Sequence, residues 1–139
     1  MLATSLKRIL IVEDDPDIQA IIRFSLESVG HFTVKVCSNG REALSLASSF
    51  APDLILLDVM MPHWDGTILL KVLRKQPQTS HIPVIFLTDR VQPHQIVQYK
   101  ELGALDVIAK PFDPMTLPQK INNIWSKAAF ELILSNSLT

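Results

Sequence analysis

The sequence predicts an α/β fold in which helices cover both faces of one parallel sheet. Four short runs of β-branched and aliphatic residues lack polar alternation, which is typical of parallel strands buried on both faces. Segments with helical spacing of apolar residues separate these runs, as in a doubly wound sheet. A chain of 139 residues has room for one such domain. We expect a single domain over residues 1–139, with a core at about 7–127 and a helical extension or tail at 128–139.

Five segments are predicted strands. One of them, Phe32–Cys37, alternates polar and apolar residues more than the others, so we expect it at an edge of the sheet. The other four are continuously apolar. In chain order the strands are Arg8–Val12, Phe32–Cys37, Leu54–Leu57, Pro83–Leu87 and Asp106–Ala109.

Five segments are predicted helices, and capping residues mark their starts. Asp15 precedes a proline at the first helical position, and Asp65 precedes the third helix. The last helix is expected to begin at Thr116, because the run from Thr116 to Gln119 is a capping-box pattern. The predicted helices are Pro16–Val29, Arg41–Phe50, Gly66–Lys75, Pro93–Leu102 and the segment that begins at Thr116.

Composition excludes several classes of protein. Thirteen basic residues against fourteen acidic ones give a net charge of −1, which argues against nucleic acid as a partner. The single Cys37 excludes an internal disulfide and fits a reducing compartment. No apolar run approaches the roughly 20 residues of a membrane span, and no signal peptide is evident. We therefore expect a cytoplasmic protein with no membrane insertion.

Polar residues follow the predicted strands at the edge where ligands of parallel sheets bind. The first strand is followed by Glu13, Asp14 and Asp15, and the third by Asp58. The fourth strand is followed by Thr88 and the fifth by Lys110. Acids, a hydroxyl and a cation are thus expected to converge on one edge of the sheet.

This set of side chains suits magnesium-dependent phosphoryl transfer. Asp14, Asp15 and Asp58 would repel one another, so the site favours a hard cation such as Mg²⁺. Lys110 and Thr88 offer a positive charge and a hydroxyl to phosphoryl oxygens. Asp58 is the candidate nucleophile, which would form an acyl phosphate, because it ends a central, buried strand.

The same residues resemble the receiver domain of two-component response regulators. The motifs are Glu13-Asp14-Asp15, Asp58-Val59-Met60-Met61-Pro62 with Asp65-Gly66, Leu87-Thr88 and Lys110-Pro111-Phe112, within a match from about Lys7 to about Lys127. The resemblance implies a flavodoxin-like sheet of order 2-1-3-4-5.

The resemblance also implies a role for each residue of the site. Asp58 would be the phosphoacceptor, with Asp15 and Asp58 as direct Mg²⁺ ligands and Asp14 acting through water. The Met60 carbonyl would complete the protein ligands. Thr88 would be the switch hydroxyl and Lys110 the catalytic phosphate partner, and the Lys110-Pro111 bond would be cis.

Two residues depart from the family pattern. The position three residues before the lysine, a switch position that is usually aromatic in the family, is Val107. The residue after the threonine, usually small in the family, is Asp89, which could instead pair with Arg90 or Lys110. These departures leave the phosphorylation chemistry in place but affect the expected relay from phosphate to surface.

Three functions follow as hypotheses. The leading one is a phosphorelay receiver that accepts a phosphoryl group on Asp58 from a sensor histidine kinase or a histidine phosphotransfer protein. It would signal through an unknown downstream protein target, and would be no enzyme beyond its own phosphorylation and dephosphorylation. A receiver-like scaffold without phosphorylation is the alternative, and a Mg²⁺-dependent phosphohydrolase is the third. The apolar tail leaves a homodimer open.

Overall fold

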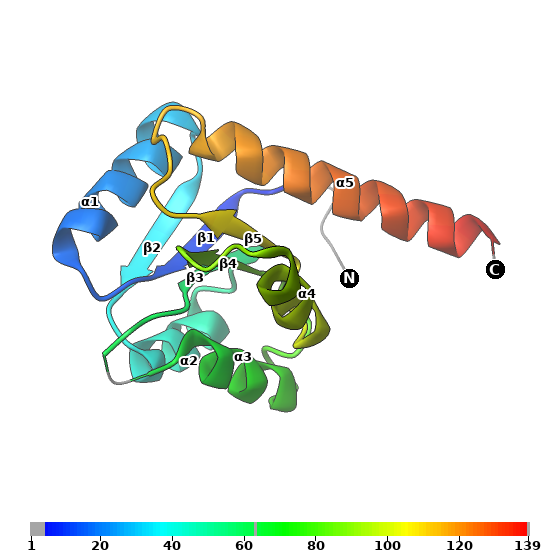
Figure 1. Cartoon of the computed structure of the whole chain (residues 1–139), viewed down its shortest axis with the longest axis horizontal. Helices are drawn as coiled ribbons and strands as arrows, with labels where there is room; N and C mark the ends of the chain where they lie inside the picture. Colours follow the sequence, from blue (N-terminus) through cyan, green and yellow to red (C-terminus); the bar gives the residue numbers. More distant parts are fainter. Residues whose placement is uncertain (1–4, 63, 139) are drawn as a thin grey trace.

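Five parallel strands form one sheet in the order β2-β1-β3-β4-β5 in the computed structural model (Figure 1). Residues 5–62 and 64–138 are described, and the other positions of the predicted domain, 1–4, 63 and 139, lie outside the described residues. The predicted parallel sheet and its order are confirmed, with Thr33–Cys37 at one edge. The strands are β1 (Arg8–Val12), β2 (Thr33–Cys37), β3 (Leu54–Asp58), β4 (Val84–Thr88) and β5 (Asp106–Ala109).

The helices lie close to their predicted positions, with small differences at their ends. The predicted helix Pro16–Val29 ends in a π-helical turn, because its last five residues depart from α geometry. The last helix begins one residue after Thr116, so that Pro118 falls in its first turn, where its missing N–H is tolerated. The helices are α1 (Pro16–Phe24), the π turn η1 (Ser25–Val29), α2 (Gly40–Ser49), α3 (Gly66–Lys75), α4 (Pro93–Glu101) and α5 (Leu117–Leu138).

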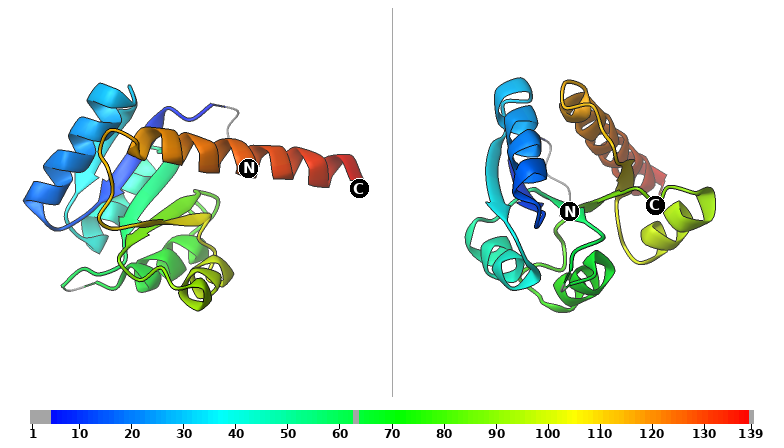
Figure 2. Two further views of the ribbon diagram at one scale, coloured as in Figure 1. Left: turned by 45° about the horizontal axis from the view of Figure 1, so that its top comes forward. Right: turned by 60° about the vertical axis from the view of Figure 1, so that its left-hand side comes forward.

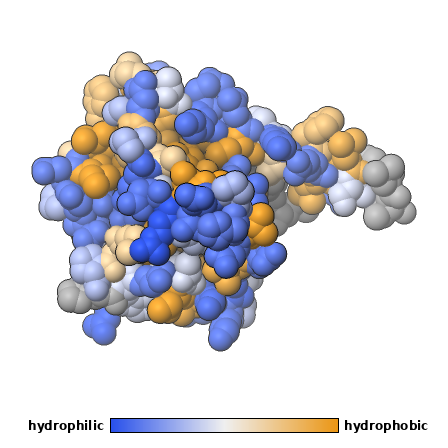
Figure 3. Space-filling view, in the orientation of Figure 1, coloured by the Kyte–Doolittle hydropathy of each residue, from blue (hydrophilic) through white to orange (hydrophobic). Residues whose placement is uncertain are grey.

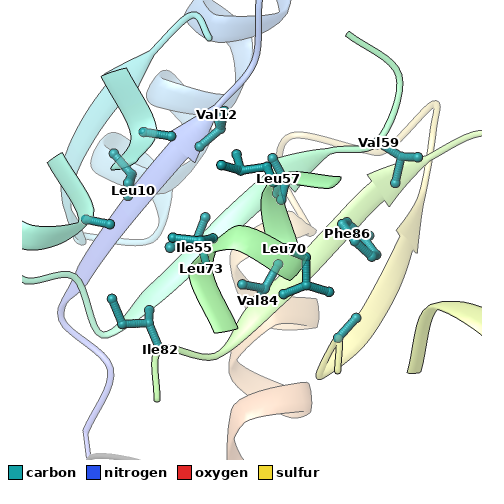
Figure 4. Packing of buried hydrophobic residues seen from close by; sticks show 14 of the residues in the cluster. Leu10, Val12, Ile55, Leu57, Val59, Leu70, Leu73, Ile82, Val84 and Phe86 are labelled. Atoms are coloured by element: carbon teal, nitrogen blue, oxygen red, sulfur yellow. The ribbon is translucent and has the colours of Figure 1, made fainter. Parts of the chain in front are cut away.

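The sheet lies between two helical layers, with α1 and α5 on one face and α2, α3 and α4 on the other (Figures 1 and 2). Strand side chains alternate between the layers: Ile9 and Ile11 pack toward α1 and α5, and Leu10 and Val12 toward α2 and α3. Figure 4 shows the hydrophobic core that contains Leu10 and Val12. Each fully buried aliphatic side chain contributes roughly 1.5–3 kcal/mol, so both layers hold the strand ends in place.

Helix α5 is longer than the sheet it covers. Leu117, Ile121 and Trp125 are buried against the sheet. The helix then continues past the body of the molecule, as Figures 1 and 3 show, and carries Phe130 with 60% of its surface exposed. The predicted extension at 128–139 is therefore helical as far as Leu138.

No helix in the described part of the chain is long and apolar enough to cross a membrane.

At the amino edge of the sheet, charged side chains bind backbone groups. The Arg8 guanidinium donates to the Phe50 carbonyl and lies 4.1 Å over the Phe50 ring. The Asp53 carboxylate accepts from the backbone N–H groups of Lys7 and Arg8, at 3.0 and 2.9 Å. Arg74 on α3 donates to the carbonyls of Ile82 and Gly103. These contacts fix the loops that lead into β1 and β3.

Candidate functional site

Asp58 lies at the centre of the carboxyl edge of the sheet. It ends β3, which pairs with β1 on one side and β4 on the other, and only 3% of its surface is exposed. Its Oδ1 accepts a hydrogen bond from the Met60 backbone N–H at 3.1 Å and lies 3.0 Å from the Lys110 Nζ. The carboxylate is thus held by one backbone donor and one cation.

Two further acids approach Asp58. One carboxylate oxygen each of Glu13, Asp14 and Asp58 lies within 4.8 Å of the others. Glu13 is only 1% exposed, and its Oε2 has no hydrogen-bond partner among the described residues. Lys110 Nζ lies 3.7 Å from that oxygen, beyond hydrogen-bonding distance. The cluster therefore contains three carboxyl groups, and the single ammonium group of Lys110 cannot neutralise all of them.

The surroundings of Glu13 oppose its negative charge. Burial, together with a hydrogen bond to Asp58 and the negative charge of Asp58, raises the pKa of Glu13 from 4.5 to about 8, although Lys110 acts in the opposite direction. The raised pKa favours the protonated form of Glu13, in which the carboxyl group can donate to Asp58 instead of repelling it. A cation that entered the cluster would displace this proton.

The structure does not bring Asp15 into this cluster. The Asp15 carboxylate caps α1, accepting from the backbone N–H groups of Asp17 at 2.8 Å and Ile18 at 3.4 Å. Glu13 takes the place beside Asp58 that the sequence analysis gave to Asp15. The pair of acids next to Asp58 is thus Glu13 and Asp14, where Asp14 and Asp15 were predicted.

Local chain geometry explains this correction. Glu13 directly follows β1, and its N–H still bonds to the Cys37 carbonyl at 3.0 Å, so its side chain stays with the buried strand end. Pro16 begins α1, which makes Asp15 the capping residue. The signal for Glu13 was its position immediately after a buried strand.

Thr88 and Lys110 lie on neighbouring strand ends beside Asp58. The Lys110 N–H donates to the Thr88 carbonyl at 2.9 Å, which joins the ends of β4 and β5. The Thr88 hydroxyl is buried and accepts from the Arg90 N–H at 3.0 Å. The Lys110-Pro111 bond is cis, as expected.

The loop between β3 and α3 closes over Asp58. Met60 forms a short antiparallel bridge with Asp65, and its side chain is 54% exposed. A Cβ at Gly66 would lie 2.6 Å from the Asp58 carbonyl oxygen, so only glycine allows this close approach. The backbone of Met60 is thereby held next to the Asp58 side chain, and the metal-binding role of its carbonyl stays a prediction.

Val107 pairs in register with Phe86 on β4 and packs at the margin of the core formed with α2, α3 and α4. An aromatic ring in this region comes from α4 instead, since Tyr99 meets Phe86 edge to face at 5.2 Å between ring centroids. Asp89 is exposed, and no pairing with Arg90 or Lys110 is found.

The three clustered acids fit a divalent cation. They supply only oxygen donors, as Mg²⁺ prefers, and no described residue forms a hydrogen bond to the buried Glu13 Oε2. A lysine beside the same carboxylate provides charge for a phosphoryl group. The arrangement can therefore combine metal binding with acceptance of a phosphoryl group.

The chain belongs to the response regulator receiver domain family, whose model matches residues 9–122. It is thus a receiver domain of two-component response regulators, as the sequence motifs indicated. This family accounts for the acids, threonine and lysine found at one edge of the sheet.

Several relatives support this assignment. PilH of Pseudomonas aeruginosa is 38% identical over 117 residues, covering 84% of this chain and 96% of PilH. The transcriptional regulatory protein PhoP of Bacillus subtilis is 38% identical over 118 residues, covering 85% of this chain and 48% of PhoP. The regulator ycf27 of Guillardia theta is 37% identical over 134 residues, covering 94% of this chain and 51% of ycf27. The chain therefore spans about half the length of the two transcriptional regulators.

Solved structures agree with the fold. The chemotaxis response regulator CheY4 of Vibrio cholerae superposes with a TM-score of 0.78 at 31% identity, covering 86% of this chain and 99% of CheY4. The receiver domain of the Francisella response regulator 1452 has a TM-score of 0.77 at 31% identity, covering 88% of this chain and 98% of that domain.

Proposed function

We propose that this receiver accepts a phosphoryl group on Asp58, in a Mg²⁺-dependent reaction, from a sensor histidine kinase or a histidine phosphotransfer protein. The observation that carries the proposal is the buried Asp58 carboxylate, 3.0 Å from Lys110 and clustered with two further acids. Phosphoryl transfer depends mainly on positioning and charge neutralisation, and this site is built for both.

Each residue has a distinct part in the proposed reaction. Glu13, Asp14 and Asp58 would hold Mg²⁺ together with the Met60 carbonyl, and the bound ion would neutralise negative charge between the carboxylates and the phosphoryl oxygens. An Asp58 oxygen forms a bond to phosphorus while the bond from phosphorus to the donor histidine nitrogen breaks, and that nitrogen keeps the electron pair. Lys110 exchanges its contact with Asp58 for one with a phosphoryl oxygen.

The Thr88 hydroxyl donates to a second phosphoryl oxygen in this proposal. It now accepts from the Arg90 N–H, and its proton is free to point elsewhere. Phosphorylation would thus move Thr88 and, through it, the loop that follows β4. Signal output then passes to a protein target in the cytoplasm, and the domain has no external substrate of its own.

Intact-mass spectrometry tests the proposal. Incubation with phosphoramidate or acetyl phosphate and Mg²⁺ should add the mass of one phosphoryl group. This adduct should be absent from Asp58→Asn and from wild type treated with EDTA. Asp17→Asn, which alters an exposed acid on α1, is the matched control and should keep the adduct. A folded protein that gains no phosphoryl group would favour the scaffold, and donor hydrolysis without an adduct would favour the phosphohydrolase.

A further inference from the structure

The side chain of Trp64 joins two parts of the chain at the carboxyl edge of the sheet. Trp64 belongs to the loop between β3 and α3, and its indole lies against Gly40, the first residue of α2. A Cβ at Gly40 would lie no more than 2.9 Å from three atoms of the indole ring, so only glycine allows this close approach. Trp64 is also half-buried against the core formed with α2, α3 and α4. The contact therefore packs the β3–α3 loop directly onto the start of α2.

The first turn of α2 is held in place by contacts of its own. Asn39 caps the helix, since its side chain accepts from the Glu42 N–H at 2.9 Å. The Glu42 carboxylate accepts in return from the Ser38 N–H at 3.0 Å, which ties the residue before the cap to the first turn. A change in the contact between Trp64 and Gly40 should therefore move the β3–α3 loop rather than α2.

The same loop carries the backbone of Met60 over the acid cluster. The Met60 N–H donates to the Asp58 Oδ1 at 3.1 Å, and Met60 forms its short bridge with Asp65, the neighbour of Trp64 in the sequence. Trp64 and Asp14 line one recess of about 260 Å³, so the indole and an acid of the cluster face the same small space. The packing of Trp64 therefore helps to fix how the Met60 backbone lies relative to the acids.

We propose that Trp64 is a positioning residue for magnesium: its contact with Gly40 holds the Met60 carbonyl where it can complete the oxygen ligands of the three clustered acids. This inference rests on the proposed function, since it concerns the ion that the proposed phosphorylation requires. The indole has an N–H donor and no acceptor to offer a cation, so Trp64 acts through the loop. Substitution of groups that orient metal ligands typically lowers metal affinity about 10- to 100-fold.

The test is a double-mutant cycle in which Mg²⁺ affinity is measured by calorimetric titration. Gly40→Ala forces the indole away from α2, and Trp64→Ala removes the indole, so each should weaken Mg²⁺ binding about 10-fold. The double variant should bind Mg²⁺ no more weakly than Trp64→Ala, because the methyl group added at position 40 then meets no ring. Urea unfolding in EDTA shows in parallel that each variant is folded.

Two further variants and a rate measurement separate positioning from packing. Trp64→Phe keeps an aromatic ring against Gly40 and should restore most of the affinity that Trp64→Ala loses. Ile68→Ala, which shortens an exposed side chain on α3, is the matched control and should leave Mg²⁺ affinity unchanged. Phosphorylation of Gly40→Ala should be slow at low Mg²⁺ and approach the wild-type rate at saturating Mg²⁺, because binding of the ion is what the substitution impairs.

Unchanged Mg²⁺ affinity in folded Gly40→Ala and Trp64→Ala would overturn the inference, and so would additive effects in the double variant. Loss of stability without loss of affinity would likewise assign Trp64 to packing alone. A wild-type protein that binds no Mg²⁺, or that gains no phosphoryl group, would instead contradict the proposed function, so the two failures are distinguishable.

Discussion

Charged residues have different kinds of partner at the two edges of the sheet. At the amino edge, Arg74 donates to the Ile82 carbonyl at 2.8 Å and to the Gly103 carbonyl at 3.2 Å, and Asp53 accepts from two backbone N–H groups. At the carboxyl edge, Glu13 and Asp58 face each other around one lysine. Backbone groups satisfy the first set, whereas in the second set the buried Glu13 Oε2 has no hydrogen-bond partner among residues 5–62 and 64–138.

The partners of these charged residues distinguish the two roles: residues at the amino edge stabilise the fold, and residues at the carboxyl edge are arranged to bind a ligand. A buried charge that is paired with backbone groups stabilises the loops it joins. A cluster of like charges costs stability unless protons or cations neutralise it. Substitutions at the amino edge should therefore lower stability and spare phosphorylation. Substitutions within the cluster of Glu13, Asp14 and Asp58 should impair phosphorylation without lowering stability.

Asp14 and Asp15 give the largest expected contrast. Asp14→Ala removes an oxygen from the acid cluster and should weaken Mg²⁺ binding about 100-fold or more, without loss of stability. Asp15→Ala removes the cap of α1, so it should cost about 1 kcal/mol and leave Mg²⁺ affinity within about twofold. Calorimetric Mg²⁺ titration and urea unfolding of both variants measure this contrast. Loss of Mg²⁺ binding in Asp15→Ala alone would restore the pair predicted from sequence.

Arg74 tests the opposite edge. Arg74→Ala leaves the Ile82 and Gly103 carbonyls without their donor, and should lower the free energy of unfolding by about 2–3 kcal/mol. Lys71→Ala, at an exposed position on the same helix, is the control and should change stability by less than about 0.5 kcal/mol. Both variants should still be phosphorylated. A large loss of phosphorylation in folded Arg74→Ala would contradict the separation of the two edges.

Glu13 predicts a pH dependence of stability. Its pKa rises from 4.5 to about 8 on folding, because burial and Asp58 disfavour its charge. Between these values the folded protein binds more protons than the unfolded one, so stability falls as pH rises and levels off above about 8. Glu13→Gln should remove this slope and raise stability at pH 8 by about 4 kcal/mol in EDTA. Thermal unfolding from pH 5 to 8 shows whether wild type has the steeper profile, and parallel profiles would refute the assignment.

Most of the candidate site could be predicted from the sequence, because its residues are brought together by the order of the strands. Asp58, Thr88 and Lys110 each end a strand, and parallel strands bring such residues to one edge. Among the three consecutive acids after β1, the metal-binding roles were predicted for Asp14 and Asp15, because apolar patterning does not say which acid continues the strand and which caps the helix. The position of Pro16 contained that information, since the residue before a helix-starting proline is a cap.

Other features of the structure could not be predicted from the spacing of apolar residues. The π turn Ser25–Val29 keeps apolar residues at spacings that an α-helix would also give, so periodicity alone cannot distinguish the two. The contact between Trp64 and Gly40 depends on how the loop after β3 meets α2, which is a matter of tertiary packing. Asp89 was visible in the sequence, but that it forms no ion pair with Arg90 or Lys110 was not.

The most direct test of the central claim is to locate the phosphoryl group itself. Protein phosphorylated in the presence of Mg²⁺ is treated with borohydride, which reduces an aspartyl phosphate to homoserine, and the peptides are sequenced by mass spectrometry. Homoserine at position 58, and at no other acid of the carboxyl edge, is the result we predict. Homoserine at Asp14, Asp15 or Asp89 with an unmodified Asp58 would contradict the account.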